Sequence, residues 1–508
     1  MPNRSASEGS ERIRELRISG KVLTDDATLA KFTRDMSHYS VKPTVVAIPE
    51  NEEDIAQIVA YAKENGIPLT PRGAGSNQSG SSVGSGIVVF FSEMNKIMQR
   101  TGYRVKVQPG AIYGQVDKEL RKDGLRLPYD PSSRLFCTIG GNVGTKASGL
   151  RSLKYGSVDA ALRSLRFFDA KHGLVDTSKQ LPDGLETEIS LLRTRLLSDL
   201  ETKHVFDSRA NLKSSSGYNL KSFYQYEDSR EIVTHLLAES VGTLGVFTEI
   251  ELEAVPSPKN TSMYLLFFSS LVDAAWDAAM MKRFGASAVE LMDRYGLEVL
   301  VDKGIVDVPA ASQALLIVEF DSDLEQAENL MANHFREKSI PFKNVQDIKT
   351  QEAIWEVRET MLLRILNTLE TSDEKFPSFA DDVAVPPERL PDFVSAVQSV
   401  LNRFGTSAVF FGHAGEGNLH IRPKLKKENW AENLRELADQ IFKITLQFGG
   451  TITSEHGNGR NRSLYLRNEW GEKIYSYFEE IKRIFDPSNI LNPGVVFTTD
   501  DVTKNLQL

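Results

Sequence analysis

Cysteine is almost absent from this sequence of 508 residues, in which Cys137 is the single example. The chain therefore cannot form an internal disulfide, a zinc site built on paired cysteines or a four-cysteine iron–sulfur cluster. Long apolar runs are missing too: no stretch offers the roughly 18 apolar residues of a membrane span, and the N-terminus has no signal-peptide core. These absences predict a cytoplasmic protein, with attachment to a membrane through a partner as the alternative.

An excess of positive charge is also lacking. Sixty Lys and Arg residues against 69 Asp and Glu residues give a net charge of −9. That sign is wrong for a protein that binds nucleic acid by neutralising phosphates. Otherwise the composition, with 41% hydrophobic and 25% charged residues, is that of an ordinary globular protein.

The pattern of expected elements changes along the chain. The first half alternates strand-like and helix-like runs and then turns to long Gly- and Ser-rich loops, and Pro256 and Pro258 mark a boundary. The second half repeats strand and helix units in a ferredoxin-like order. We expect an N-terminal extension, a first domain, a second domain and a tail at residues 1–41, 42–257, 258–497 and 498–508, with the two end segments peripheral.

Three glycine-rich segments occur in the first domain: PRGAGSNQSG (71–80), TIGGNVGTKASG (138–149) and GTLG (242–245). Backbone amides of such turns can approach a phosphate because no Cβ blocks the way, and Arg72 can add charge. The first segment alone is equally consistent with a loop that merely needs glycine, and it lacks the third glycine of a Rossmann fingerprint. The second is expected to form an extended chain of donors. Together the three favour a large, multi-part cofactor.

Three of the eight histidines fall in two glycine-rich loops of the second domain. FFGHAGEGNLHIRP places His413 and His420 on either side of a turn, and EHG sets Glu455 beside His456. Two histidines and a carboxylate can form a three-ligand catalytic metal site with an open position. From spacing alone, hydrogen-bonded histidines without a metal are the more frequent outcome.

These segments together resemble a known family. PRGAGSNQSG, PYDPSS, TIGGNVGTKASG, LKYGS and GTLGVFTEIELE follow the order and spacing of the vanillyl-alcohol-oxidase-type FAD-binding domain. The second half is similar to the FAD-linked oxidase domain of D-lactate dehydrogenase, glycolate oxidase and D-2-hydroxyglutarate dehydrogenase. The resemblance, over about residues 32 to 497, implies an α+β fold: a two-subdomain FAD-binding domain plus a ferredoxin-like α+β substrate (cap) domain.

The resemblance also implies which residues bind which group. Some relatives attach flavin covalently through a histidine of the first loop, but this loop has none, so non-covalent FAD is expected. HAGEGNLH and SEHGNG resemble the family's HxGDGNxH and GEHGxG, which makes His413, His420 and Glu455 ligands of a divalent metal, Zn or Mn, and His456 the catalytic base. The expected FAD-binding residues are Arg72, Gly73, Ala74, Gly75, Ser76, Asn77, Ser133, Thr138, Gly141, Asn142, Ser148, Gly149, Val246 and Asn492.

A substrate carboxylate calls for arginine, whose guanidinium binds carboxylates bidentately. Arg358 lies at the family's substrate arginine, and Arg422 follows the second metal histidine, although a surface salt bridge is an equally frequent role for such a residue. Relatives acting on 2-hydroxyglutarate carry a lysine and an asparagine where this sequence has Ala380 and Arg422. The side chain of the substrate therefore stays open.

The sequence predicts an FAD-dependent dehydrogenase that oxidises a D-2-hydroxy acid of the lactate, glycolate or 2-hydroxyglutarate class to the 2-oxo acid. The hydroxyl proton would go to His456 with help from the metal, and the hydride to flavin N5. Relatives with the most similar C-terminal motifs carry a fused iron–sulfur domain, so we expect a separate acceptor here: an iron–sulfur protein, a cytochrome or an electron-transfer flavoprotein. A homodimer is compatible with the sequence.

Three alternatives to this function stay open. The first is an FAD oxidase that uses oxygen and releases hydrogen peroxide. The second is a non-catalytic flavin-binding subunit of a larger complex. The third is a metallohydrolase built on His413, His420 and Glu455.

Overall fold

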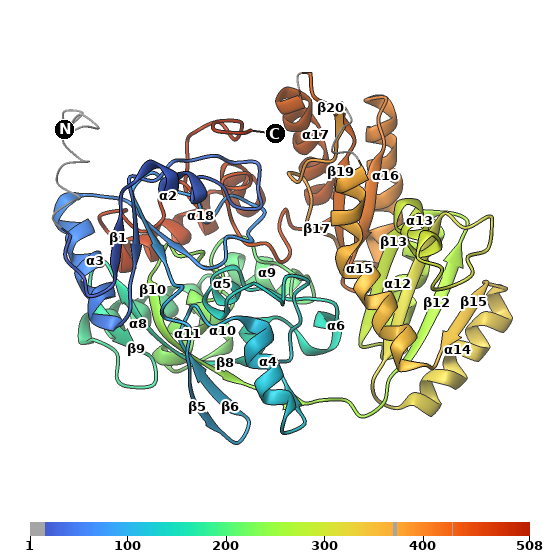
Figure 1. Ribbon diagram of the computed structural model, residues 1–508, viewed down its shortest axis with the longest axis horizontal. Helices are drawn as coiled ribbons and strands as arrows, with labels where there is room; N and C mark the ends of the chain where they lie inside the picture. The colour runs from blue at the N-terminus through green and yellow to red at the C-terminus, as the bar shows by residue number, and fades with distance from the viewer. Residues whose placement is uncertain (1–15, 369–372, 429, 508) are drawn as a thin grey trace.

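The computed structural model describes residues 16–368, 373–428 and 430–507. The chain forms two lobes that stand side by side in Figure 1. The first lobe contains residues 16–257 together with the C-terminal helix α18 (Leu466–Phe485) and the described segment after it. The second lobe contains residues 258–368, 373–428 and 430–447. The loop 448–465 connects the second lobe back to the first.

Two sheets build most of the first lobe. Its strands are β1 (Lys21–Leu23), β2 (Val45–Ile48), β3 (Leu69–Arg72), β4 (Ile87–Phe90), β5 (Ile97–Thr101), β6 (Arg104–Val107), β7 (Leu125–Arg126), β8 (Leu162–Asp169), β9 (Gly173–Asp176), β10 (Val246–Glu253) and β11 (Val255–Pro256). A four-stranded sheet has the order β1-β2-β4-β3, in which β2 and β3 run parallel to β4. An antiparallel sheet has the order β5-β6-β10-β8-β9, and β11 pairs with β7.

The helices of the first lobe follow local sequence signals. In α3, Asn51 caps the N-terminus by accepting from the amide of Asp54, and Gly66 ends the helix at φ 63°. Its buried residues recur at helical spacing, from Ile55 to Ala62. The helices are α2 (Asp26–Lys31), α3 (Glu52–Asn65), α4 (Tyr113–Arg121), α5 (Ile139–Thr145), α6 (Ser152–Tyr155), α7 (Val158–Ala161), α8 (Asp183–Ser198), α9 (Leu200–Ser208), α10 (Ser222–Gln225) and α11 (Ser229–Leu237).

Helix α5 differs from the expectation, because TIGGN was expected to be extended and is instead the start of a helix. Thr138 caps this helix by accepting from the amide of Gly141. Gly140 packs against Pro109 so closely that an added Cβ would lie 2.7 Å from the Pro109 Cβ. Capping and close packing outweigh the low helix propensity of glycine at this site.

The second lobe is built on one antiparallel sheet of order β15-β12-β14-β13-β18-β19-β17. Its strands are β12 (Ser262–Phe268), β13 (Ala288–Asp293), β14 (Ala314–Phe320), β15 (Phe342–Val345), β17 (Val383–Ala384), β18 (Ala408–Gly412) and β19 (Asn418–Pro423), while β16 (Glu374–Lys375) pairs with β20 (Leu425–Lys426). The helices are α12 (Leu271–Arg283), α13 (Arg294–Asp302), α14 (Leu324–Lys338), α15 (Ile348–Thr368), α16 (Leu390–Arg403) and α17 (Trp430–Gln447), with short 3-10 turns η2 (Pro387–Arg389) and η3 (Ala414–Glu416). The connecting loop 448–465 contains a further 3-10 turn, η4 (Ser463–Tyr465).

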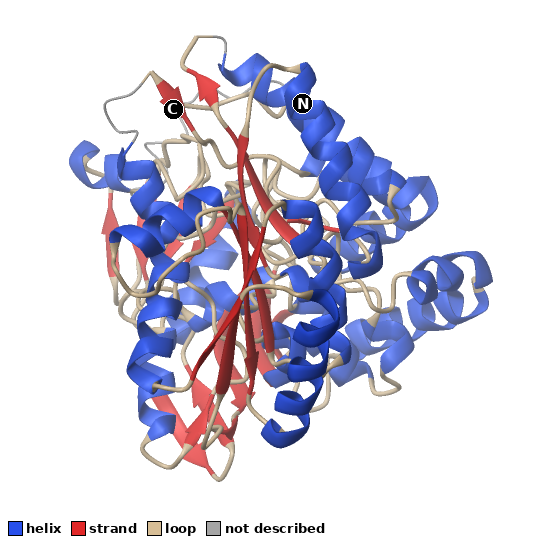
Figure 2. Cartoon of the chain, turned by 90° about the vertical axis from the view of Figure 1, so that its right-hand side faces the viewer, coloured by secondary structure: helices blue, strands red, loops and turns tan. Residues whose placement is uncertain are grey.

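Helices cover both faces of this sheet, as Figure 2 shows. Leu265 and Phe267 of β12 share a core with apolar residues of α13 and α15. Leu266 and Phe268, which point the other way, share a core with α12, α14 and α16. Strands buried on both faces read as nearly continuous apolar runs, which explains MYLLFF and ALLIVEF.

The two ends of the chain pack onto the first lobe. The ring centres of Phe485 in α18 and Phe167 in β8 lie 6.4 Å apart. Leu491 forms an isolated β-bridge with Leu69, the first residue of β3. Tyr39 is buried and pairs with Leu506, so the N-terminal and C-terminal segments hold each other. The first lobe is therefore built from both the beginning and the end of the chain, and the lobes do not coincide with two consecutive stretches of sequence.

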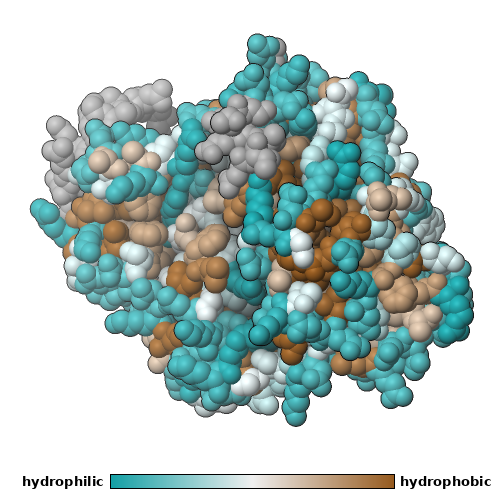
Figure 3. All heavy atoms as spheres, turned by 45° about the vertical axis from the view of Figure 1, so that its right-hand side comes forward, coloured by the Kyte–Doolittle hydropathy of each residue, from teal (hydrophilic) through white to brown (hydrophobic). Residues whose placement is uncertain are grey.

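The outer surface seen in Figure 3 is mainly hydrophilic, with apolar side chains gathered in separate patches. Among the helices of the described residues, none combines the length and the apolar character needed to cross a bilayer.

Candidate functional site

A pocket lies where the two lobes meet and draws its lining from both. The first lobe contributes its three glycine-rich segments, whose side chains are small. The second lobe and the loop 448–465 contribute Arg358, Glu359, Leu362, Phe411, His413, His420, Arg422, Glu455 and His456. One wall is therefore almost uncharged and the other carries most of the ionisable groups.

Twelve of the fourteen residues predicted to bind FAD line this pocket. The other two lie behind the lining. Val246 is buried in the core beside Phe168. The amide nitrogen of Asn492 donates to the carbonyls of Ser81 and Val241 at 2.8 and 2.7 Å, so this residue holds two lining segments in place.

Glycine lets the lining segments approach one another closely. A Cβ added to Gly73 would lie 2.1 Å from Thr138 Oγ1, and one added to Gly149 would lie 2.0 Å from the carbonyl oxygen of Asp130. Gly141 is different, because its added Cβ would meet one protein atom within 4 Å, Thr138 Oγ1 at 3.2 Å. A larger side chain at Gly141 would therefore extend into the pocket. A pocket lined by backbone in this way fits a large planar cofactor with a pyrophosphate.

Arg72 has a second task besides lining the pocket. Its guanidinium donates to the carbonyls of Arg34 at 2.7 Å and of Ser82 at 3.1 Å. It thereby fastens the N-terminal segment to the first glycine-rich loop.

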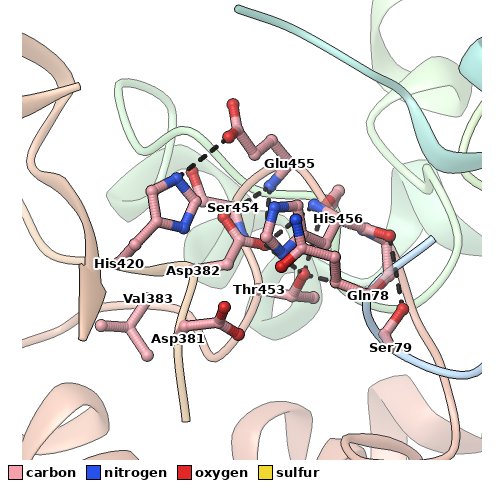
Figure 4. A network of polar contacts seen from close by, with 12 residues as sticks. Gln78, Ser79, Asp381, Asp382, Val383, His420, Thr453, Ser454, Glu455 and His456 are labelled. Atoms are coloured by element: carbon pink, nitrogen blue, oxygen red, sulfur yellow. Dashed lines mark hydrogen bonds and ion pairs between the residues drawn. The ribbon is translucent and has the colours of Figure 1, made fainter. Parts of the chain in front are cut away.

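The predicted histidine loops come together on the pocket wall, and we call His413, His420, Glu455 and His456 the histidine cluster. In β18 and β19, Phe411 pairs with His420, and the turn η3 between the strands follows His413. His413 Nε2 lies 3.0 Å from Glu455 Oε2, and His420 Nε2 lies 3.2 Å from Glu455 Oε1. The rings of His420 and His456 stack with centres 5.1 Å apart (Figure 4).

The donor atoms of this cluster fit a divalent metal ion. Ligand atoms of Asp382, His420, Glu455 and His456 lie within 4.8 Å of one another, and His413 reaches the same carboxylate from the other side. Imidazole nitrogens with a carboxylate oxygen are the ligands of catalytic Zn and are also suited to Mn.

Asp382, which the sequence reasoning did not single out, organises the loop that carries Glu455 and His456. Its carboxylate accepts hydrogen bonds from the backbone amides of Ser454, Glu455 and His456 at 2.8 to 3.2 Å. It also accepts from the hydroxyl of Thr453 at 2.8 Å. Because these donors occupy both oxygens, Asp382 acts as an anchor for the loop more readily than as a ligand. Adjacent aspartates before a short strand, FADDVAVP, were the available signal.

Glu290 is a second residue that the sequence did not reveal. It is fully buried on β13 and contacts Nδ1 of His413, so the Nε2 of that ring faces Glu455. Burial favours neutral His413, but the carboxylates of Glu290 and Glu455 outweigh it and raise the pKa of His413 to about 9. The same Glu290 accepts from Arg358, whose Nη2 lies 2.6 Å away.

The two predicted substrate arginines are both buried on the pocket wall. Arg358 is 5% exposed and lies 5.1 Å from the ring centre of Phe411. Arg422 is 4% exposed, lies 3.0 Å from Asp381 and contacts Gln78, and its Nε has no hydrogen-bond partner among the described residues. A surface salt bridge is therefore not the role of Arg422.

Two family models match the chain. "FAD binding domain" matches residues 43–178 and "FAD linked oxidases, C-terminal domain" matches residues 257–496. Glycolate oxidase subunit GlcD of Bacillus subtilis is 27% identical, with 96% of each chain covered. D-lactate dehydrogenase of Anaerostipes hadrus is 28% identical, with 97% of this chain and 98% of the relative covered. D-2-hydroxyglutarate dehydrogenase of Escherichia coli is 28% identical over 94% of this chain, which spans 50% of that relative.

A solved structure of alkyldihydroxyacetonephosphate synthase has the same fold, with a TM-score of 0.65 at 17% identity over 97% of this chain and 85% of that one. The fold expected from the sequence, with an FAD-binding domain and a second α+β domain, is thus confirmed. The two family models together span most of the chain and meet at the pocket. The chain is a flavoprotein oxidoreductase of the FAD-linked oxidase family.

Proposed function

We propose that this protein is an FAD-dependent dehydrogenase that oxidises a D-2-hydroxy acid to the 2-oxo acid. The observation that carries the proposal is the position of the histidine cluster and two buried arginines on the wall opposite the glycine-rich segments of one pocket. Such a pocket brings a flavin, a metal-binding group and a carboxylate-binding group around one small substrate.

The glycine-rich wall would hold FAD, and His413, His420 and Glu455 would hold a divalent metal. When bound there, FAD supplies the acceptor for a hydride from the substrate Cα, and the metal supplies a Lewis acid for the substrate hydroxyl. Glu290 holds His413 in the tautomer that leaves Nε2 free as a ligand.

The remaining chemistry belongs to side chains of this chain. The guanidinium of Arg358 binds the substrate carboxylate, and Phe411 beside it limits how that group can turn. A ring nitrogen of His456 accepts the hydroxyl proton as the carbonyl forms. Asp382 keeps His456 in place through its backbone amide.

The names of the relatives support this class of substrate. Glycolate, D-lactate and D-2-hydroxyglutarate are all 2-hydroxy acids. Arg422 is buried on the wall, and its Nε has no hydrogen-bond partner within the described part of the chain, so it supplies a second group for the side chain of the substrate.

The FAD is proposed to be non-covalent. The residues of the first loop that line the pocket include no histidine. Cys137 also lines it, but burial raises the pKa of this thiol to about 11, which keeps it protonated and unreactive. Acid precipitation should release yellow FAD into the supernatant, and flavin that stays in the pellet would show a covalent bond.

The electrons are proposed to leave through a separate acceptor protein, an iron–sulfur protein, a cytochrome or an electron-transfer flavoprotein, because the single cysteine of this sequence cannot hold a cluster. Stopped-flow reoxidation of the reduced enzyme tests this point. Reoxidation by air-saturated buffer as fast as turnover with an artificial acceptor would make the protein an oxidase that forms hydrogen peroxide.

Anaerobic bleaching of the flavin tests the function itself. The purified enzyme is mixed with a panel of D- and L-2-hydroxy acids in the absence of oxygen. The absorbance of the oxidised flavin band, at about 450 nm, is followed. The proposal expects bleaching by at least one D-acid and slower bleaching by the matching L-acid. A flavin that no hydroxy acid reduces would identify a non-catalytic subunit.

A further inference from the structure

Lys213 of the first lobe reaches the histidine cluster from outside the pocket. It lies in the loop between α9 and α10, and its side chain is 10% exposed. Its Nζ lies 3.0 Å from Glu455 Oε2, 3.1 Å from Ser152 Oγ and 3.2 Å from Glu416 Oε2. An ammonium group has three protons, and each of these neighbours can accept one.

The two oxygens of Glu455 have different partners. Oε2 accepts from Lys213 and from the hydroxyl of Ser148 at 2.6 Å, both in the first lobe, and it also lies 3.0 Å from His413 Nε2 of the second lobe. Oε1 faces His420. The first lobe thus sets the rotation of the carboxylate that the second-lobe histidines need as a partner.

Lys213 also restrains the turn that carries His413. Glu416 is the last residue of η3, three positions after His413, and its carboxylate contacts both Lys213 and Ser152. The two carboxylates of Glu416 and Glu455 therefore share one cation. Without that cation they would repel each other across a buried site, and Glu455 would gain by turning away from His420.

We propose that Lys213 is a positioning residue for the metal site: it holds Glu455 and the η3 turn so that His413, His420 and Glu455 converge on one ion. This inference rests on the metal site of the proposed function. It makes the site a joint product of both lobes, because the cation that orients the metal-binding carboxylate belongs to the flavin-binding lobe.

Lys146 provides a matched control. It is also a lysine of the first lobe with a largely covered side chain, 17% exposed, and its Nζ lies 2.9 Å from Glu239 Oε2 and 3.3 Å from the carbonyl of Ser214. None of its recorded partners belongs to the histidine cluster. Substitution at either position removes a lysine that is largely covered by the protein. Only substitution of Lys213 also removes a contact with Glu455.

The experiment measures metal affinity directly. The FAD-loaded enzyme is stripped with a chelator and titrated with Zn²⁺ in competition with a chromophoric chelator, while flavin absorbance and the melting temperature are recorded. Lys213→Met is expected to weaken Zn²⁺ binding by about 10- to 100-fold, the usual effect of losing a partner of a metal ligand. Lys213→Arg should restore most of the affinity, and Lys146→Met should bind Zn²⁺ like the wild type even where its melting temperature falls.

The Zn²⁺ affinities of these variants decide whether Lys213 positions the metal site. Wild-type affinity in Lys213→Met, or an equal loss in Lys146→Met, would overturn the inference while leaving the proposed function in place. A wild-type enzyme that takes up no Zn²⁺ would instead refute the metal site of the proposed function, and this inference with it. If Lys213→Met does not fold, Lys213→Gln, which keeps a hydrogen-bond donor and removes the charge, is expected to show the same weakening, and wild-type affinity there counts against the inference.

Discussion

The two walls of the pocket differ in kind. Among the described residues of the first-lobe wall, Arg72 is the one charged side chain, and the rest is mainly glycine, serine, threonine and asparagine. The opposite wall has nine lining residues, of which seven are arginine, glutamate or histidine. A wall of backbone and hydroxyl groups suits binding of a large ligand, and a wall of buried ionisable groups suits proton transfer and metal binding. Changes to the two walls should therefore separate cofactor binding from chemistry.

The largest effect is expected on the first-lobe wall. Gly141→Leu places a side chain in the pocket, where its Cβ meets one protein atom, Thr138 Oγ1 at 3.2 Å. The protein should fold but be purified without flavin, and therefore without activity. The ratio of flavin to protein absorbance measures this, with Gly184→Leu on the exposed face of α8 as a folded, yellow control. A yellow Gly141→Leu enzyme would contradict the assignment of this wall to FAD.

The second effect belongs to the opposite wall. His413→Ala and His420→Ala should lose the metal and more than ~100-fold of the activity, since the Lewis acid and its ligand are removed together. Both should keep FAD, because neither residue belongs to the three glycine-rich segments of the first lobe. Metal content by mass spectrometry and flavin absorbance on the same sample give the two readings. Loss of flavin along with the metal would show that the walls are not separable.

The third effect divides the charged wall itself. His456→Ala should keep metal and flavin but slow anaerobic flavin reduction by at least ~100-fold, the usual scale of losing a general base. Asp382 accepts from the backbone amide of His456 at 2.8 Å, whereas the ring Nδ1 lies 3.8 Å from the same carboxylate, so the loop should keep its shape when the ring is removed. A variant that is reduced at the wild-type rate would remove His456 from the mechanism.

The smallest effect is expected from Glu290→Gln. The amide can still accept from His413 but no longer neutralises Arg358, which lies 2.6 Å from the native carboxylate. Metal affinity should fall by about 10-fold, at the lower end for a partner of a metal ligand. Competition titration with Zn²⁺ measures this affinity. Glu290→Ala, which removes the hydrogen-bond acceptor altogether, should bind Zn²⁺ still more weakly than Glu290→Gln. Equal affinities in wild type and Glu290→Ala would exclude a role in orienting His413.

Sequence reasoning located the residues of the pocket where they lie in compact motifs. His413 and His420 flank one turn, so their proximity followed from local geometry. The EHG motif added Glu455 and His456, and the family resemblance assigned their roles as ligand and base. It could not find the groups that hold them. Glu290 lies 123 positions before His413, and Lys213 lies 242 positions before Glu455. Such partners are brought in by strand pairing and by the contact between lobes, which leave no local pattern.

For the glycine-rich segments, the sequence predicted the location but not the backbone conformation. Their location at a cofactor pocket was predicted from composition. TIGGN was expected to be extended, and the structure gives helix α5, because Thr138 caps it and Gly140 packs on Pro109. Glycine permits many conformations, so only tertiary packing decides which one forms.

The most direct test of a metal-assisted flavin dehydrogenase is single-turnover reduction of one enzyme sample in three states. The enzyme is mixed anaerobically with its best D-2-hydroxy acid as purified, after chelation with FAD retained, and after Zn²⁺ or Mn²⁺ is returned. We expect fast flavin bleaching in the enzyme as purified and bleaching at least ~100-fold slower in the chelated enzyme. The fast rate should return when the metal is restored. Chelated enzyme that bleaches at the original rate with no bound metal would contradict it.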